Sequence, residues 1–400
     1  MERKYMEHAA PAVFIALVGM VSLFSVATGV MLTSIEMDYG VTTSAVGLIP
    51  ALSSGGESLA YVLAGFWRKR RLGIRELAAY FICLFLVTLA IGLRPPFFAL
   101  CMLYGLLGLL VGFLNFAGNT VVASSYTQDR SKYIAILYVS MGMGCALASL
   151  YPTSALDRGV YWGRLYRQYA LYVALLAVAA ITALLPRLHR FGDISCGSRV
   201  EGGGESALSF LVKKGRAKLA ALCLVALMYQ GHQIVLVSWI ASYMTQWLHV
   251  DAVSAGVTIS LFSMGLLISR LLSALLSKRF TTRQMVVAGC LLGGGLLASG
   301  LFAGRAAAMM VTFPLAGMVT GWILPMVISC GYNLFPENPV AVASTINTAS
   351  ALGGMSFSWL AGIIAHSVSF PAAISLTVLN LLAAALLMLL IPSGRTAEKQ

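Results

Sequence analysis

The sequence has few charged residues for its length. Of its 400 residues only 10% are charged, whereas 59% are hydrophobic and the mean hydropathy is +0.86. About a quarter of the residues of a soluble protein are charged. A water-soluble core of this size cannot hide so many apolar residues, so the composition excludes a soluble fold and predicts that lipid covers much of the chain.

Acidic residues are the scarcer of the two charged kinds, with 14 Asp and Glu against 27 Lys and Arg, which gives a net charge of +13. The basic residues stand in short clusters between long apolar runs. That pattern is typical of membrane-protein loops and speaks against a nucleic-acid partner.

Enzyme and cofactor signatures are also missing. The seven cysteines lie mostly inside apolar segments and have no disulfide or metal spacing. The sequence contains no zinc-protease motif, phosphate-binding loop or dinucleotide fingerprint. We therefore expect neither an enzyme nor a bound cofactor or metal. Arg3 and Lys4 precede an apolar run that has no small-residue cleavage site, so we expect no cleavable signal.

The chain does contain long apolar runs. A helix needs roughly 20 apolar residues to cross about 30 Å of hydrocarbon at 1.5 Å per residue. Twelve runs meet this requirement, at residues 10–33, 43–67, 76–93, 97–122, 133–155, 166–186, 218–246, 252–277, 284–303, 306–334, 340–366 and 370–391. The predicted fold is an all-α membrane protein of about twelve transmembrane helices.

The runs divide into two equal sets. Residues 187–217 contain three consecutive glycines and many basic residues, and are predicted to be a cytoplasmic linker between six-helix bundles at 1–186 and 218–400. Most Lys and Arg residues fall on one side of the predicted spans, which places both termini in the cytoplasm. The halves also echo each other: Gly108 and Gly112 in the fourth span match Gly317 and Gly321 in the tenth. Six-helix repeats are typical of secondary transporters, whose solute site lies between the halves.

Several motifs make the chain resemble the major facilitator superfamily over its whole length, and within it the fucose permease-like branch of sugar:proton symporters. They include Tyr229-Gln230-Gly231-His232-Gln233, Ser269-Arg270 and Leu352-Gly353-Gly354. The resemblance implies that the first, fourth, seventh and tenth spans surround a central solute path and that the halves alternate between inward-open and outward-open states. It further implies a monomer in the inner membrane that carries a small solute together with protons.

The sequence departs from this branch in its acids. No acid lies within span 10–33, the fourth span has Asn115 and Asn119 in place of a Glu-x-x-x-Asn motif, and Gln233 stands where the seventh span has a glutamate. The loop after the second span lacks the aspartate of the superfamily motif.

Polar side chains inside the spans are the candidates for the solute site, because such groups are costly in lipid and need partners. Asn115 and Asn119 share one helix face and suit the hydroxyls of a neutral solute, or else they join two helices. In the seventh span an aromatic and amide stripe suits a sugar ring, or else is a packing stripe with a core histidine. Its candidate residues are Tyr229, His232, Gln233, Trp239 and Tyr243. Trp322 and Asn347 are further candidates.

Two charged residues within the spans are candidates for coupling. Arg270 could clamp a carboxylate, which would make the protein a carrier of organic anions similar to the monocarboxylate or oxalate carriers, or it could hold helix ends together. Glu57 is the only acid well inside a predicted span, and could take up and release a proton, or else hydrogen-bond to the eleventh helix as a protonated acid.

The leading hypothesis is a secondary transporter of a sugar-like solute coupled to protons. The organic-anion carrier is the alternative. Multidrug or metabolite antiport is a third hypothesis, disfavoured because the fifth span has Gly142, Gly144 and Pro152 but no Gly-Pro pair.

Overall fold

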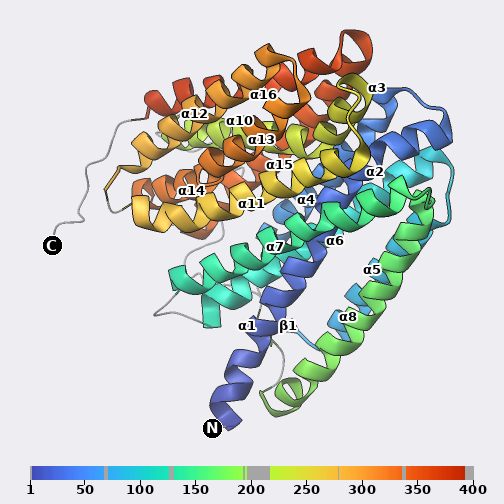
Figure 1. Ribbon diagram of the computed structural model, residues 1–400. Helices are drawn as coiled ribbons and strands as arrows, with labels where there is room; N and C mark the ends of the chain where they lie inside the picture. Colours follow the sequence, from blue (N-terminus) through green and yellow to red (C-terminus); the bar gives the residue numbers. More distant parts are fainter. Residues whose placement is uncertain are drawn as a thin grey trace.

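The computed structural model describes residues 2–66, 71–125, 130–191, 194–195, 217–277, 279–335 and 339–391. Within these residues the chain is a bundle of helices, of which twelve are long and apolar enough to span a membrane (Figure 1). The elements of the first half are α1 (Glu2–Val21), α2 (Leu23–Tyr39), α3 (Thr43–Val46), α4 (Leu48–Phe66), β1 (Arg71–Leu72), α5 (Ile74–Gly92), α6 (Phe97–Ser125), α7 (Arg130–Asp157), α8 (Trp162–Phe191) and β2 (Ile194–Ser195). The second half contains α10 (Ala217–Ser242), the π-helix η1 (Tyr243–Trp247), α11 (Ala252–Leu276), α12 (Thr282–Ala303), α13 (Ala306–Thr320), α14 (Ile323–Leu334), α15 (Pro339–Ser367) and α16 (Phe370–Leu389).

The prediction of about twelve spans is confirmed, but the first span was predicted too short. It runs from Pro11 to Tyr39, not from 10 to 33, because α2 continues past the apolar run and carries Glu36 and Asp38 in its last turns. Acids are tolerated there because a helix end reaches the polar boundary of the bilayer. Below, the end of the bundle at Tyr39 is called the outer end. The opposite end, where α1 begins, is called the inner end and is the predicted cytoplasmic side.

Each half has its own apolar core. One core is built from residues between Phe14 and Leu184, and the other mainly from residues between Leu219 and Ile391. Val26, Val30 and Ala148 of the first half belong to the second core and so join the halves. Most of residues 187–217, the predicted linker, lie outside the described residues, as do Trp67 to Arg70 in the loop after the second span.

Glycines allow α4 and α6 to pack backbone against backbone. A β-carbon at Gly108 would clash with the carbonyl oxygen of Ser53, and one at Gly112 would lie 2.9 Å from the Cα of Glu57. Small residues give such close approach in lipid, where hydrophobicity cannot drive helices together. This contact fixes the position of Glu57 relative to the fourth span.

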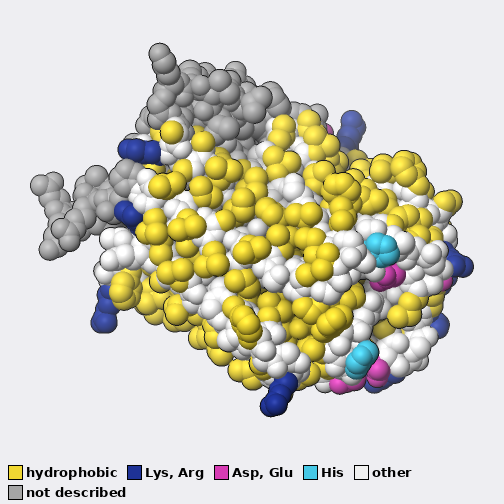
Figure 2. Space-filling model, turned by 90° about the horizontal axis from the view of Figure 1, so that it is seen from above, with side chains coloured by type: hydrophobic (Ala, Val, Ile, Leu, Met, Phe, Trp, Pro, Cys, Tyr) yellow, Lys and Arg dark blue, Asp and Glu magenta, His cyan; other side chains and the backbone are white. Residues whose placement is uncertain are grey.

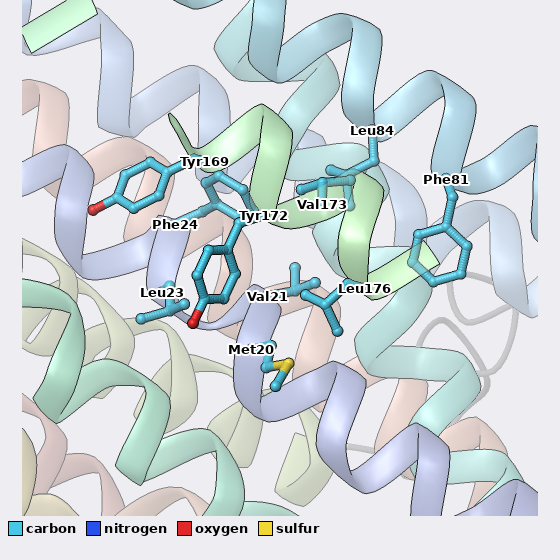
Figure 3. A pocket seen from close by; sticks show the side chains of 10 residues that line it. All are labelled: Met20, Val21, Leu23, Phe24, Phe81, Leu84, Tyr169, Tyr172, Val173 and Leu176. Carbon is cyan, nitrogen blue, oxygen red and sulfur yellow. The ribbon is translucent and has the colours of Figure 1, made fainter. Parts of the chain in front are cut away.

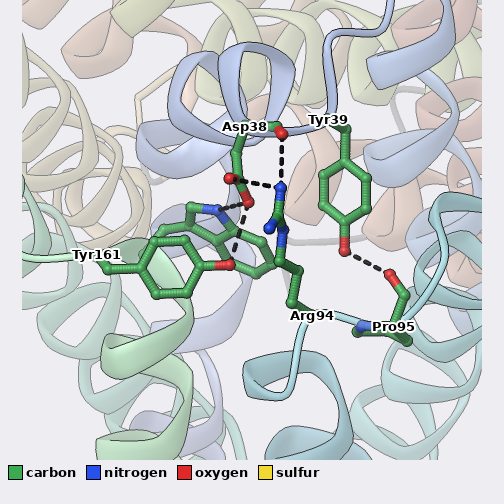
Figure 4. Close-up of polar contacts among 6 residues, drawn as sticks. Asp38, Tyr39, Arg94, Pro95 and Tyr161 are labelled. Atoms are coloured by element: carbon green, nitrogen blue, oxygen red, sulfur yellow. Dashed lines mark hydrogen bonds and ion pairs between the residues drawn. The ribbon is translucent and has the colours of Figure 1, made fainter.

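A polar staple fastens the outer end of the first half (Figure 4). The Asp38 carboxylate forms an ion pair with Arg94 at 3.0 Å and accepts hydrogen bonds from the Tyr161 hydroxyl and the Trp162 indole, both at 3.1 Å. Partial burial and then the hydrogen bond to Asp38 raise the pKa of Tyr161 to about 12, so this hydroxyl stays protonated and can donate. The staple ties α2 to α8 and to the loop between α5 and α6.

The surface of the bundle is largely apolar, as the composition predicts. Figure 2 shows hydrophobic side chains across most of one face, with the Lys and Arg side chains mainly toward its rim. Large exposed side chains include Phe302, 94% exposed, and Leu171, 62% exposed. A lipid environment accounts for this surface, since patches of this extent are rare on soluble monomers.

Candidate functional site between the two halves

The two halves meet closely at the outer end. The Thr33 and Ser242 hydroxyls lie 3.0 Å apart, and the Gln246 amide donates to Glu36 at 3.4 Å. A β-carbon at Gly29 would clash with the backbone of Val237, so α2 and α10 are in direct backbone contact. The outer end between the first and seventh spans is therefore closed.

A tryptophan seals the same end between α3 and α15. A β-carbon at Gly362 would lie 2.9 Å from the Trp239 ring and one at Gly47 would lie 3.2 Å from it. The Trp239 indole donates to the carbonyl of Ser358 at 3.2 Å, and its side chain is fully buried. Trp239, one of the predicted site residues, is part of this closure.

Away from this closure, and among the residues that the structure describes, two helix pairs make extensive contact between the halves. The α4–α15 contact includes a hydrogen bond from Ser58 to the carbonyl of Thr348, at 3.4 Å, and the α7–α11 contact places Gly142 against Leu267. Of the residues that the structure describes, α1 makes no extensive contact with α10, and α6 makes none with α14. The described contacts between the halves are thus concentrated at the outer end and along α4–α15 and α7–α11.

A group of polar side chains from both halves lies in the inner part of this interface. We call it the interface cluster. Its members are Glu57 and Tyr61 of α4, Asn115 of α6, Tyr138 and Cys145 of α7, Tyr229 of α10 and Arg270 of α11.

Arg270 is the cationic member of the cluster. It extends from the second half across the interface, with its guanidinium carbon 5.5 Å from the centre of the Tyr138 ring in the first half. Its charge also acts on Cys145 and Tyr229. The Nε of Arg270 is buried without a hydrogen-bond partner, and the Tyr229 hydroxyl lies within hydrogen-bonding reach of the Arg270 guanidinium. Buried polar groups are nearly always paired, so the unpartnered Nε is a donor that a ligand can use.

Glu57 is the acidic member. Its charge acts on Tyr61, one turn along α4, and on Cys145 of α7. Within the described part of the chain it forms no ion pair with Arg270, although both act on Cys145. The hydrogen bond from α4 to α15 is made by the neighbouring Ser58, so Glu57 itself is not the residue that ties α4 to the eleventh span.

The two asparagines of α6 differ in their surroundings. The side chain of Asn115 lies within hydrogen-bonding reach of the Tyr61 hydroxyl and is 6% exposed. The amide of Asn119 donates to the backbone carbonyl of Asn115 at 2.8 Å and is partly exposed. Asn115 therefore belongs to the interface cluster, whereas one amide N–H of Asn119 is already used in a hydrogen bond within α6.

Gln233 and Asn347 are half-buried on helices that face the other half. Gln233 lies one turn before Val237, whose backbone contacts Gly29, so it shares the helix face that points across the interface. Gln230, one turn earlier, shares this face and was not among the predicted site residues. Asn347 precedes Thr348, the partner of Ser58.

Three predicted site residues point into the second half instead. His232 is fully buried on the side of α10 that faces Thr377 and Asn380 of α16. Trp322 donates from its indole to the carbonyl of Met285 at 2.9 Å. Tyr243 packs edge-on against Phe313, with ring centres 6.4 Å apart. The seventh-span stripe is therefore divided between the interface and the core of the second half, because its residues spread over more than one helix face.

Two hollows elsewhere in the protein are poor candidates for the solute site. An apolar cleft between the first, third and sixth spans has a volume of about 10 Å³, which is room for one water molecule (Figure 3). An open depression of about 350 Å³ at the outer end is lined by residues around the Asp38 staple, whose polar atoms already bind one another.

Comparison with known proteins agrees with this architecture. The sequence model described as Major Facilitator Superfamily matches residues 13–358. A crystal structure of a bacterial homolog of the human lysosomal transporter Spinster, in an inward-facing and occupied conformation, aligns with a TM-score of 0.68 at 14% identity and covers 97% of this chain and 96% of its own. The inward-facing, unoccupied form of that homolog aligns with a TM-score of 0.66, at the same identity and coverage. No curated protein matches the sequence.

Proposed function

The chain belongs to the Major Facilitator Superfamily, and from this premise we propose that it is a secondary active transporter that moves a small polar solute across the inner membrane by alternating access, coupled to protons. Alternating access requires a solute site between two bodies that open in turn to each side. The observation that carries the proposal is the interface cluster, which combines buried polar side chains of both halves below a closed outer end.

The solute class has two candidates. A sugar-like solute, implied by the resemblance to the fucose permease-like branch, has support from the amides of Asn115, Gln233 and Asn347. It has no support from His232, Trp239 or Trp322. His232 is buried within the second half, and the two indoles donate hydrogen bonds to backbone carbonyls. An organic anion has support from Arg270, whose Nε has no partner.

Coupling is proposed at Glu57. A carboxylate inside a membrane protein is costly to keep charged and is often a proton carrier. Glu57 of the first half and Arg270 of the second half both act electrostatically on Cys145, so a change in the charge of Glu57 changes the electrostatics of the interface. Multidrug efflux has no specific support among the described residues, and we do not favour it.

The test is uptake into proteoliposomes containing the purified protein. Radiolabelled hexoses and carboxylates are offered with and without an inward proton gradient. We expect saturable uptake of at least one of these solutes and its accumulation only with the gradient. Solute-independent leakage, or no uptake above empty liposomes for the whole panel, contradicts the proposal.

A further inference from the structure

We propose that Glu36 and Gln246 form a proton-sensitive latch, which holds the outer end closed while the Glu36 carboxyl group is ionised and weakens when that group takes a proton from the outer side. The inference rests on the proposed alternation of the two halves, but on neither the solute class nor the coupling at Glu57. It gives both residues a role in setting which end of the protein is open.

The latch joins one acceptor to donors from both halves. The Glu36 carboxylate accepts a hydrogen bond from the Thr43 hydroxyl of its own half and another, at 3.4 Å, from the Gln246 amide of the second half. The same amide nitrogen donates to the Thr33 hydroxyl, also at 3.4 Å. Gln246 therefore reaches across the interface to two side chains of α2, of which Glu36 is the acidic one.

The backbone that carries Gln246 departs from an ordinary helix. Residues Tyr243–Trp247 form the π-helix η1 at the end of α10, and His249, two residues later, has a φ of 55°. π-Helical turns are rare and occur frequently at functional sites, and a positive φ is uncommon for a residue other than glycine. Such departures are typical of segments that take part in switching. The seventh span thus presents Gln246 to Glu36 from an unusual backbone.

The ionisation of Glu36 decides the strength of the latch. An ionised carboxyl group only accepts hydrogen bonds, so its two oxygens suit the donors of Thr43 and Gln246, and its charge makes each bond roughly twice as strong as a neutral one. After protonation one oxygen carries a hydrogen and faces another donor. Glu36 is half-buried at the outer end, where protons reach it from that side of the membrane. Acid outside is therefore expected to open the outer end.

Other titratable groups lie at the outer end and have to be separated from Glu36. The elements around the end of α2 bring Asp38 and Tyr39 of α2, Arg94 after α5, Asp157 and Arg158 at the end of α7, Tyr161 and Arg164 at the start of α8, Tyr243 of η1, His249 and Asp251 after η1, and His366 of α15. Asp38 is held by the polar staple, and Asp251 caps α11 by accepting from the Ser254 backbone at 2.8 Å. The two histidines are exposed and are tested as separate variants.

The experiment measures the distance between spin labels at the outer ends of the two halves. The labels are attached through Leu93→Cys and Val368→Cys, at positions that are 65% and 70% exposed, in a cysteine-free background that retains uptake. The protein is studied in nanodiscs without solute from about pH 4 to about pH 8, a range in which carboxyl groups and histidines titrate. We expect acid to shift the ratio of the long to the short distance roughly 5- to 10-fold, as expected when a charged hydrogen bond becomes a neutral one.

Variants of the pair assign the response to the latch. Glu36→Gln should shift the protein toward the long distance at all pH values and remove the response to acid. Gln246→Glu places two carboxyl groups together, so it should open the outer end at alkaline pH and close it in acid, when the pair shares one proton. The double variant with Glu36→Gln and Gln246→Glu exchanges the acid and the amide, and should restore both the closed state and the original direction of the response.

Controls exclude the neighbouring groups. Asp38→Asn is the matched control on the same helix, because this acid bonds only within the first half, and it should keep the response to acid. His249→Gln and His366→Gln should keep it as well. Glu57→Gln, which should lose gradient-driven accumulation, should still respond to acid at the outer end and so separates the latch from the proposed coupling site.

The latch is overturned by an acid response of unmodified size in Glu36→Gln, or by one of unmodified direction in Gln246→Glu. An outer distance that does not change with pH in the unmodified protein overturns it too. Uptake measured on that same protein then distinguishes the two proposals. If it accumulates a hexose or a carboxylate under a proton gradient, the proposed function stands without the latch, and if it transports neither, both proposals fail.

Discussion

At the residue scale, the sequence identified both charged members of the interface cluster and two of their polar neighbours, Asn115 and Tyr229, but it did not identify the others. Glu57 and Arg270 stand out because charges are rare within the spans. Tyr61 and Tyr138 lie within apolar runs, and only the packing of the helices brings them beside those charges. His232 lies against α16 and not in the cluster, which the sequence could not show, since helical spacing gives the face of a residue but not the neighbour of that face.

Glu57→Gln tests coupling directly. The amide keeps the shape of the side chain and removes its titration, so the variant should still bind and exchange solute but should fail to accumulate it under a proton gradient. Counterflow and gradient-driven uptake measured on the same proteoliposomes separate the two activities. Accumulation at the unmodified level would exclude Glu57 as the proton site.

Gln233→Ala tests the face of α10 that points toward the first half. Loss of a hydrogen bond to solute costs about 1–3 kcal/mol, or roughly 5- to 150-fold in affinity. Asn119→Ala should have a smaller effect, because the Asn119 amide already donates to the Asn115 carbonyl. Half-saturation concentrations of the transported solute check both variants, with the exposed Gln168→Ala as control. Unchanged affinity for Gln233→Ala would show that it only packs the helices.

At the element scale, the helices were predictable because their length and apolarity are fixed by the bilayer, whereas their breaks were not. The first span is interrupted at Ser22, whose carbonyl faces the thiol of Cys145 at 3.6 Å. The seventh span ends in the π-helix η1, which presents Gln246 to Glu36. Both breaks depend on contacts with another helix, and the sequence around each break resembles that of an uninterrupted span.

A disulfide between Thr33→Cys and Ser242→Cys tests whether the α2–α10 contact opens during transport. The two hydroxyls lie 3.0 Å apart, so the thiols replacing them should cross-link on mild oxidation. The oxidised protein should lose transport and regain it after reduction, since solute cannot then enter from the outer end. Each single-cysteine variant serves as control. Full transport by the cross-linked protein would show that this contact does not move.

At the scale of the whole molecule, the sequence predicts the division into halves but does not predict which end is closed. Apolar runs and Lys and Arg placement predicted twelve spans and an orientation, and the spans are confirmed. Which end is closed depends on contacts between the halves, such as Trp239 between Gly47 and Gly362, and no sequence pattern reveals these.

The predicted orientation is tested by labelling single cysteines with a membrane-impermeant reagent. Cysteine at position 205, and the native Cys196, should be protected in intact cells, whereas cysteines at Arg158 or Arg164 should react. Positions 196 and 205 lie outside the described residues, so this prediction rests on the basic loops alone. Reaction at position 205 in intact cells would invert the topology.

The central claim is that two halves open in turn around the interface cluster, and distance measurements between spin labels test it most directly. One pair joins the outer ends at Met37 and Phe302, which are 73% and 94% exposed, and the other joins the inner ends at Leu185 and Phe280. We predict that transported solute and acidic pH redistribute both pairs between two distances in opposite directions, the outer pair lengthening as the inner pair shortens. One unchanging distance for each pair, in protein that transports solute, would contradict the account.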